Sequence, residues 1–341
     1  MPKLRMNLDE LTRMRRSWVS AMGSFGGGGT SDDGRLQEVS DFAPNPGALR
    51  MLRYVPPALP PGAPLVVVMH GCTQNAAGFA EGTGWLTLAE RHGFALIFPE
   101  QSRSNNANTC FNWFEPGDIT RGAGEVASVR AMVARMQTDQ RIDPARVFVT
   151  GLSAGGAMTA ALLATYPDVF VAGAIIAGLP FHCATGVSEA LGAMRHCPAH
   201  TPAEWGDRVR AASPAPQRKP IVSIWHGDAD TTVMVSSATE QAKQWCNVHG
   251  LREPDSVDDQ VDGVAHRAWR DAGGTVRVEL YTVRGLAHGV PIDPHAPGDR
   301  GVGEAMAYVL DVGVASTWRI ARSWGLVPAG GVAQRVEPVL P

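Results

Sequence analysis

The stretch Arg146–Met158, RVFVTGLSAGGAM, decides the fold predicted for this chain. It combines an apolar run typical of a buried strand, a Gly-x-Ser-x-Gly motif and an alanine-rich helix. This order is typical of a nucleophile elbow, a sharp strand-to-helix turn at which glycines two residues before and after the serine avoid collisions. We therefore predict an α/β-hydrolase with Ser153 as nucleophile. The N–H of Ala154 would open the next helix and donate to a developing anion.

The acid of a catalytic triad is expected after the serine and before the histidine in this fold. A buried-strand pattern at Ile221–Trp225 leads into a loop with two aspartates, Asp228 and Asp230. Loops at the carboxyl ends of parallel strands lie on one edge of the sheet, where ligands gather. We predict that Asp230 is the acid and that Asp228 is a turn or N-cap residue.

The base is predicted from the next strand. Alternation of apolar and polar residues indicates a strand at Val276–Val283, and His288 follows it among small residues. A lone histidine is usually a surface or core residue. Third in the order Ser, Asp, His, this imidazole is predicted to be the general base of the triad.

A fourth element supplies a second oxyanion donor. The pattern at Leu65–His70 indicates a buried strand, and a loop follows. In this fold a backbone N–H after an early strand completes the oxyanion hole. We expect the N–H of Cys72, or alternatively that of Thr73, to pair with that of Ala154. His70 is predicted to brace the loop through hydrogen bonds rather than to transfer protons.

The chain resembles the polyhydroxybutyrate depolymerase family of esterases, with feruloyl and acetylxylan esterases as neighbours. The resemblance spans roughly residues 45 to 290. Five ordered motifs carry it: His70–Gln74, Phe98–Gln101, Cys110–Phe114, Gly151–Met158 and Gly227–Val233.

The resemblance implies roles for three residues. Asp230 corresponds to the family's acid in Gly-x-x-Asp-x-x-Val, Cys72 to its oxyanion donor, and Trp113 to an aromatic residue that contacts substrate. One departure follows His288, where this chain has Gly289-Val290-Pro291 and many members carry an aromatic residue. That departure concerns the acyl or alcohol pocket and not the triad.

Aromatic side chains are candidates to line an apolar ester cleft. Two of them, Trp113 and Phe114, lie in the long loop Gln101–Gly124, and Phe181 lies in the long loop Leu179–Trp205. Long loops at the edge of a sheet often carry function. Trp85 falls in a predicted helix and is expected to pack in the core, whereas Thr73 is a further candidate substrate contact.

The five cysteines predict two disulfides in an oxidising compartment. Cys72 and Cys110 both fall in loops at the active-site edge, Cys183 and Cys197 bracket one loop, and Cys246 would remain a thiol. Members of the family are often secreted, which favours an extracellular or periplasmic location. The first twenty residues carry charges throughout and show no signal peptide, so five reduced thiols in the cytoplasm are the alternative.

Composition excludes several classes of function. The chain has 341 residues, 44% of them hydrophobic, and a formal net charge of −3. This charge argues against nucleic acid or an anionic membrane surface as a partner. No apolar run reaches the ~20 residues of a membrane span. Neither a phosphate-binding loop nor a cysteine-histidine spacing for zinc is present, so a hydrolase without cofactor or metal is expected.

The order of elements predicts a doubly wound, mostly parallel sheet flanked by helices. Residues 1–35 are expected to be peripheral, with a helix over Asn7–Met22 and a glycine-rich linker, and residues 36–341 to form one catalytic domain. Predicted strands are Leu36–Phe42, Leu49–Val55, Leu65–His70, Leu96–Pro99, Val147–Thr150, Ala174–Ala177, Ile221–Trp225 and Val276–Val283. Predicted helices are Trp85–His92, Glu125–Thr138, Ala154–Tyr166, Ser237–His249 and Glu304–Ser323.

These observations together predict a serine esterase that forms an acyl-enzyme. The expected substrate is a polymeric or small ester: polyhydroxyalkanoate, either as 3-hydroxybutyrate polymer or as oligomers, and short-chain esters. The alternative is a feruloyl or acetylxylan esterase acting on plant cell walls. A hydrolase fold kept as a non-catalytic binding module is less favoured, because all three triad residues occur in order. The number of subunits is left open.

Overall fold

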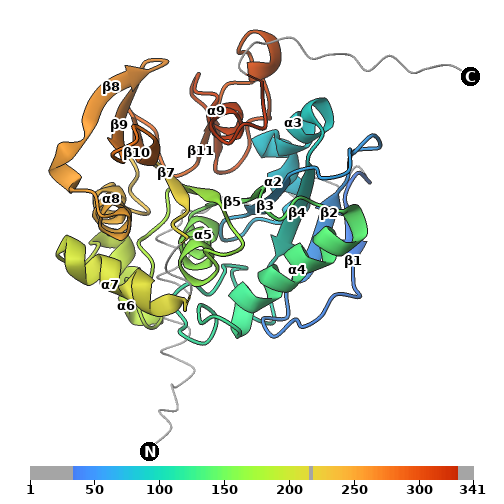
Figure 1. Cartoon of the computed structure of the whole chain (residues 1–341), viewed down its shortest axis with the longest axis horizontal. Helices are drawn as coiled ribbons and strands as arrows, with labels where there is room; N and C mark the ends of the chain where they lie inside the picture. The colour runs from blue at the N-terminus through green and yellow to red at the C-terminus, as the bar shows by residue number, and fades with distance from the viewer. Residues whose placement is uncertain (1–33, 215–217, 329–341) are drawn as a thin grey trace, which may run out of the picture.

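The computed structural model describes residues 34–214 and 218–328. Its central feature is a ten-stranded sheet with the order β1-β2-β4-β3-β5-β6-β7-β10-β9-β8 (Figure 1). The pairs from β4 to β10 along this order are parallel, and antiparallel pairs extend both edges. The strands are β1 Gln37–Val39, β2 Arg50–Tyr54, β3 Leu65–Met69, β4 Ala95–Glu100, β5 Val147–Leu152, β6 Ala172–Ile176, β7 Ile221–Gly227, β8 Val257–Val261, β9 Val264–Arg270 and β10 Val276–Val283.

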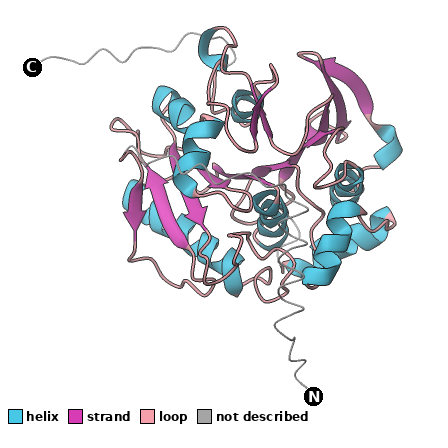
Figure 2. Ribbon diagram, turned by 180° about the vertical axis from the view of Figure 1, so that it is seen from behind, coloured by secondary structure: helices cyan, strands magenta, loops and turns pink. Residues whose placement is uncertain are grey.

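Helices cover both faces of this sheet (Figures 1 and 2). They are α2 Ala76–Thr83, α3 Trp85–His92, α4 Gly124–Gln140, α5 Ala154–Thr165, α6 Val187–Arg195, α7 Pro202–Ala212, α8 Ser236–His249 and α9 Ser316–Ser323. Two short 3₁₀ helices, η1 Glu253–Asp255 and η2 Gly298–Arg300, and a separate parallel pair, β11 Val290–Ile292 with β12 Val309–Asp311, complete the described elements. The predicted α/β-hydrolase fold is confirmed.

Strand β3 shows how the sequence builds two cores. All five of its residues are buried, as expected for a parallel strand covered on both faces. Because successive side chains point to opposite faces, Leu65, Val67 and Met69 join the core under α4, α5, α7 and α8, whereas Val66 and Val68 join the core under α2, α3 and α9. The sheet thus separates two apolar layers, and its carboxyl edge remains for the site.

The predicted helix over 304–323 is wrong in its first half. Only Ser316–Ser323 is helical, and the preceding segment contains β12. Tyr308 and Gly313 adopt positive φ angles of 64° and 69°, which an α-helix cannot accommodate. Val309, a β-branched residue, pairs with Val290 just after His288. This segment therefore returns to the site.

The predicted long loop Leu179–Trp205 is also corrected, because it contains α6 and the start of α7. Helix α7 begins with a capping box in which Thr201 and Glu204 exchange hydrogen bonds, a pattern readable in the sequence. Helix α2 and the hairpin β8–β9 were not predicted. The loop between β4 and α4 holds neither helix nor strand, as expected.

Two further expectations concern the ends of the chain and the membrane. The helix expected over Asn7–Met22 lies outside the described residues. Among the residues that the structure describes, no helix combines the length and apolarity needed to cross a bilayer.

Candidate active site

Ser153 occupies the turn between β5 and α5 with φ 57° and ψ −117°, a strained conformation for a residue with a side chain. The flanking glycines are required by close approach. A Cβ on Gly151 would lie 2.4 Å from the oxygen of Gly155, and a Cβ on Gly155 would lie 2.4 Å from the oxygen of Met69. The turn is held further by a 2.9 Å hydrogen bond from the Ser153 N–H to Ile176. This is the geometry that the Gly-x-Ser-x-Gly pattern predicts.

The structure brings His288 to Asp230, 58 residues away in sequence. Nδ1 of His288 lies 2.7 Å from Oδ2 of Asp230, and the aspartate side chain is fully buried. The other oxygen, Oδ1, accepts the N–H groups of Thr232 and Val233 at 2.8 and 2.9 Å. Burial alone would raise the pKa of Asp230, but its hydrogen bond to His288 and the charge of that imidazole outweigh burial and lower that pKa. The carboxylate is thus charged and directed at the imidazole.

Asp228 has a different partner. Its carboxylate is exposed, and Oδ1 accepts the N–H of Gly285 at 2.6 Å. A second bond, from the Asp228 N–H to the oxygen of Val283, measures 3.2 Å. Asp228 therefore ties the loop that carries Asp230 to the loop that carries His288, and the hydrogen bond of His288 goes to Asp230.

Ser153 and His288 line one small cavity. Its lining residues are Gly71, Cys72, Gln74, Leu152, Ser153, His288 and Tyr308. No hydrogen bond joins the Ser153 hydroxyl to the His288 ring among the described residues. Catalytic hydrogen bonds of this kind often tighten only in the substrate complex. A hydroxyl, an imidazole and a buried carboxylate in this order can perform nucleophilic acyl transfer.

Two backbone N–H groups beside Ser153 are suited to an oxyanion. Within residues 34–214 and 218–328, neither the N–H of Cys72 nor that of Ala154 donates to an acceptor. The N–H of Thr73, the alternative donor, is bonded to the oxygen of Asn108 at 2.7 Å. Because Thr73 is already committed, the pair Cys72 and Ala154 fits an oxyanion hole better.

His70 holds the peptide group that carries the Cys72 N–H. Its Nδ1 lies 2.7 Å from the oxygen of Gly71, and its Nε2 lies 3.2 Å from the N–H of Gln101. Since the Gln101 N–H can only donate, Nε2 accepts and the hydrogen is on Nδ1. Complete burial lowers the pKa of His70 and keeps the ring neutral. The predicted bracing role of His70 is confirmed by these two bonds.

Sequence reasoning assigned no role to three residues of the cavity, Gln74, Leu152 and Tyr308. The Gln74 amide accepts the N–H of Gly71 at 2.8 Å and donates to the oxygen of Ala307 at 3.1 Å. The ring of Tyr308 stands edge-on to His288, with centroids 6.1 Å apart. Gln74 and Leu152 belong to motifs that carry the family resemblance, and Tyr308 falls in the helix wrongly predicted over 304–323.

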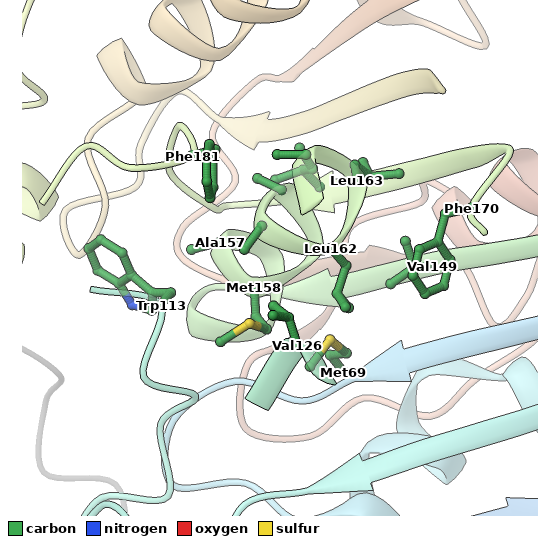
Figure 3. Close-up of a cluster of buried hydrophobic side chains, with 14 of the residues drawn as sticks. Met69, Trp113, Val126, Val149, Ala157, Met158, Leu162, Leu163, Phe170 and Phe181 are labelled. Carbon is green, nitrogen blue, oxygen red and sulfur yellow. The ribbon is translucent and has the colours of Figure 1, made fainter. Parts of the chain in front are cut away.

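The predicted substrate contacts do not line this cavity. Trp113 and Phe114 are buried, 4% and 2% exposed, in the core above α5. Figure 3 shows Trp113 and Phe181 near the end of α5 that carries Ala157 and Met158. The Thr73 hydroxyl donates to the oxygen of Cys72 at 2.6 Å. Trp85 packs against Trp324 on the other face of the sheet, as expected. Substrate binding by Thr73, Trp113 and Phe114 remains a prediction.

A buried carboxylate, Glu125 at the start of α4, holds the loop that follows β4. Its Oε1 accepts the side-chain amide of Gln101, and its Oε2 accepts the N–H of Asn112 at 2.9 Å. The Gln101 amide also donates to the oxygen of Cys110 at 3.1 Å. Burial, and then the nearby charge of Asp118, raise the pKa of Glu125 to about 8. The loop between β4 and α4 is therefore anchored by a buried acid whose pKa is raised to about 8.

Replacing Glu125 by glutamine should change how stability depends on pH. The folded state binds this proton more tightly than the unfolded chain, whose ordinary pKa is 4.5, so the free energy of unfolding should fall as pH rises from 4.5 to about 8. The neutral amide removes this loss. We expect the melting temperature of Glu125→Gln, relative to the native protein, to increase from pH 5.5 to pH 8.5. A difference that does not change with pH would contradict the assignment.

Cys72 and Cys110 form a disulfide, as predicted, with Cα atoms 4.2 Å apart. The predicted Cys183–Cys197 disulfide is wrong, because both residues are thiols. The two lie close enough for a charge on Cys197 to raise the pKa of Cys183, but burial is the larger cause and raises the pKa of both. Protonated, buried thiols are poor nucleophiles for disulfide formation. Cys246 is also a thiol, as expected.

Loss of the Cys72–Cys110 bond should lower both stability and turnover. It closes a loop of 38 residues, for which chain entropy gives about 4 kcal/mol. It also joins the loop after β3, which carries the Cys72 N–H, to the loop between β4 and α4, which carries Cys110. We expect Cys110→Ser to lower the melting temperature and kcat together. The matched variant Cys197→Ser should lower stability alone.

Thiol counting tests the premise directly. The unfolded, unreduced protein should show three reactive thiols, those of Cys183, Cys197 and Cys246. Five would mean that Cys72 and Cys110 are not bonded, and one would mean that Cys183 and Cys197 are.

The described parts of the chain offer no set of side chains that could bind a metal ion. No group of three or more histidine, cysteine, aspartate or glutamate side chains in residues 34–214 and 218–328 is arranged to hold an ion.

Comparison with known proteins places the chain among esterases. A family model described as esterase PHB depolymerase matches residues 49–270. Poly(3-hydroxyalkanoate) depolymerase C of Paucimonas lemoignei is 47% identical over 293 residues, which cover 86% of this chain and 70% of that protein. Feruloyl esterase B of Neurospora crassa is 35% identical over 265 residues, which cover 75% of this chain and 88% of that protein.

Structural comparison gives the same fold. An acetyl xylan esterase from Aspergillus awamori superimposes with a TM-score of 0.73 at 24% identity, covering 86% of this chain and 100% of the other. The resemblance noted from the motifs is confirmed by the matched model and by the identity to the depolymerase. The chain belongs to the polyhydroxybutyrate depolymerase family of carboxylic-ester hydrolases.

Proposed function

We propose that this chain is a serine esterase that hydrolyses polyhydroxyalkanoate, as 3-hydroxybutyrate polymer or oligomers, together with short-chain esters. The buried hydrogen bond from His288 to Asp230, beside Ser153 on its strained turn, is the observation that carries the proposal. The substrate class rests on the 47% identity to a poly(3-hydroxyalkanoate) depolymerase.

In the first half of the reaction, Ser153 attacks the ester carbonyl while Nε2 of His288 takes the hydroxyl proton. Asp230 keeps the other ring hydrogen on Nδ1 and stabilises the imidazolium. The N–H groups of Cys72 and Ala154 bind the tetrahedral oxyanion, which is worth about 3 kcal/mol per donor. His288 then returns its proton to the leaving alcohol, and an acyl-enzyme remains on Ser153.

In the second half, water attacks the acyl carbonyl with His288 again as base. Collapse of the second tetrahedral intermediate releases the carboxylic acid and restores the Ser153 hydroxyl.

We also propose that the enzyme works in an oxidising compartment, extracellular or periplasmic. The Cys72–Cys110 disulfide supports this location, because such bonds persist where thiols are not kept reduced.

A hydrolysis panel tests the substrate class. It compares soluble 3-hydroxybutyrate oligomers and polyhydroxybutyrate film with p-nitrophenyl butyrate, methyl ferulate and acetylated xylan. We expect the highest kcat/KM on the hydroxybutyrate oligomers among the natural substrates. A higher kcat/KM on methyl ferulate or acetylated xylan would favour the second candidate, a plant cell-wall esterase, which the 35% identity to feruloyl esterase B supports.

A further inference from the structure

His226 is a fully buried imidazole that the reaction described above does not use. It lies at the end of β7, one residue before the loop that carries Asp230. Its side chain has no exposed surface. Burying a polar ring at this depth is costly unless its hydrogen-bonding groups are satisfied. The contacts that it makes therefore need an explanation.

One ring nitrogen of His226 forms a hydrogen bond across the loop that carries Asp230. Nε2 lies 2.7 Å from the oxygen of Val233, seven residues further along the chain. A carbonyl oxygen only accepts, so Nε2 carries the hydrogen and donates. The same Nε2 lies 3.5 Å from Oδ2 of Asp230. The ring thus spans the opening of the loop and faces the catalytic carboxylate.

The other ring nitrogen settles the charge of the ring. Nδ1 of His226 is buried and has no hydrogen-bond partner among the described residues. A proton there would leave a buried donor without an acceptor. Burial also lowers the pKa of His226. The ring is therefore neutral, and it does not compete with His288 as a second cation on Asp230.

Val233 links His226 to the triad. Its oxygen accepts from His226, and its N–H donates to Oδ1 of Asp230 at 2.9 Å. The opposite oxygen of Asp230 accepts from His288 at 2.7 Å. A continuous series of hydrogen bonds therefore runs from His226 through the Val233 residue and the Asp230 carboxylate to His288.

We propose that His226 is a positioning residue for the triad acid. Its Nε2–H closes the loop at Val233, and the closed loop turns Oδ2 of Asp230 toward His288. The inference rests on the proposed function of Asp230 and His288. A role confined to filling the core would need only the size of the ring and no donor at Nε2.

Two variants separate these roles. His226→Phe keeps a ring but removes the donor, and His226→Gln places an amide N–H near the position of Nε2. With p-nitrophenyl butyrate, we expect His226→Phe to lower kcat by about 10²-fold, the scale of a misplacement of about 1 Å, with little change in KM. His226→Gln should recover most of that loss. Equal kcat in the two variants would overturn the inference.

Combination with Asp230→Asn tests whether His226 acts through the acid. In that background, His226→Phe should cost little further kcat, because the group that it positions is already lost. If His226→Phe lowers kcat as much in the Asp230→Asn background as it does in the native protein, His226 acts independently of Asp230 and the inference is overturned. Melting temperatures and fluorophosphonate labelling of Ser153 report on the folded state of each variant.

The outcomes also separate this inference from the proposed function. If Asp230→Asn itself keeps native activity, the proposed triad fails. If Asp230→Asn loses activity and His226→Phe does not, only the positioning role fails. Should His226→Phe not fold, His226→Asn takes its place, since its shorter amide cannot reach the Val233 oxygen. A kcat of His226→Asn equal to that of His226→Gln would overturn the inference.

Discussion

Replacing Ser153 by alanine should abolish ester hydrolysis and leave the fold intact. Loss of the nucleophile in a hydroxyl-dependent triad costs about 10⁶-fold in kcat. The side chain of Ser153 accepts no helix-capping hydrogen bond at the start of α5, and alanine requires the same strained backbone. We therefore expect a near-native melting temperature. The measurement is kcat on p-nitrophenyl butyrate, together with thermal unfolding.

Covalent labelling provides the control for this result. A fluorophosphonate probe should modify the native protein once, at Ser153, and should not modify Ser153→Ala. Labelling of another serine, or hydrolysis by the alanine variant at more than a small fraction of the native rate, would refute the assignment of the nucleophile.

Replacing Asp230 by asparagine should lower kcat by about 10⁴-fold, because the amide no longer holds the His288 tautomer with its hydrogen on Nδ1. The loss should be in kcat more than in KM, since Asp230 lies behind the imidazole and outside the cavity that Ser153 lines. Steady-state kinetics on soluble hydroxybutyrate oligomers measure both constants.

Asp228→Asn is the matched control, because it makes the same change two residues away. The Asp228 side chain accepts only the N–H of Gly285 among the described residues, and an asparagine oxygen can accept that bond as well. We expect a small loss of kcat in this variant. Equal losses at the two positions, or the larger loss at Asp228, would mean that the wrong carboxylate has been assigned.

Much of the fold could be predicted from the sequence because its strands obey local rules. The strand β3 is five apolar residues long, and parallel strands buried on both faces require such runs. Helix α3 has both ends at the predicted residues. The elbow was equally readable, since close contacts around Gly151 and Gly155 leave no room for a side chain.

Other elements escaped prediction because their conformation depends on distant partners. The segment before α9 contains β12, which pairs with β11 directly after His288. No local sequence pattern predicts β12, a strand of three residues whose partner β11 lies about twenty residues earlier in the chain. The error mattered, because it concealed Tyr308, a residue of the cavity that Ser153 lines.

The sequence by itself determined which residue types stand at the carboxyl edge of the sheet, and in what order. That order, Ser153, then an aspartate, then His288, follows from strand periodicity and from the loops after each strand. Only the tertiary structure decided which of two residues close together in the sequence makes each contact. It directs His288 to Asp230 and the Thr73 N–H to Asn108, and it leaves Cys183 and Cys197 as thiols. Those choices depend on side-chain directions and distances between segments far apart in the chain, and spacing along a sequence does not contain them.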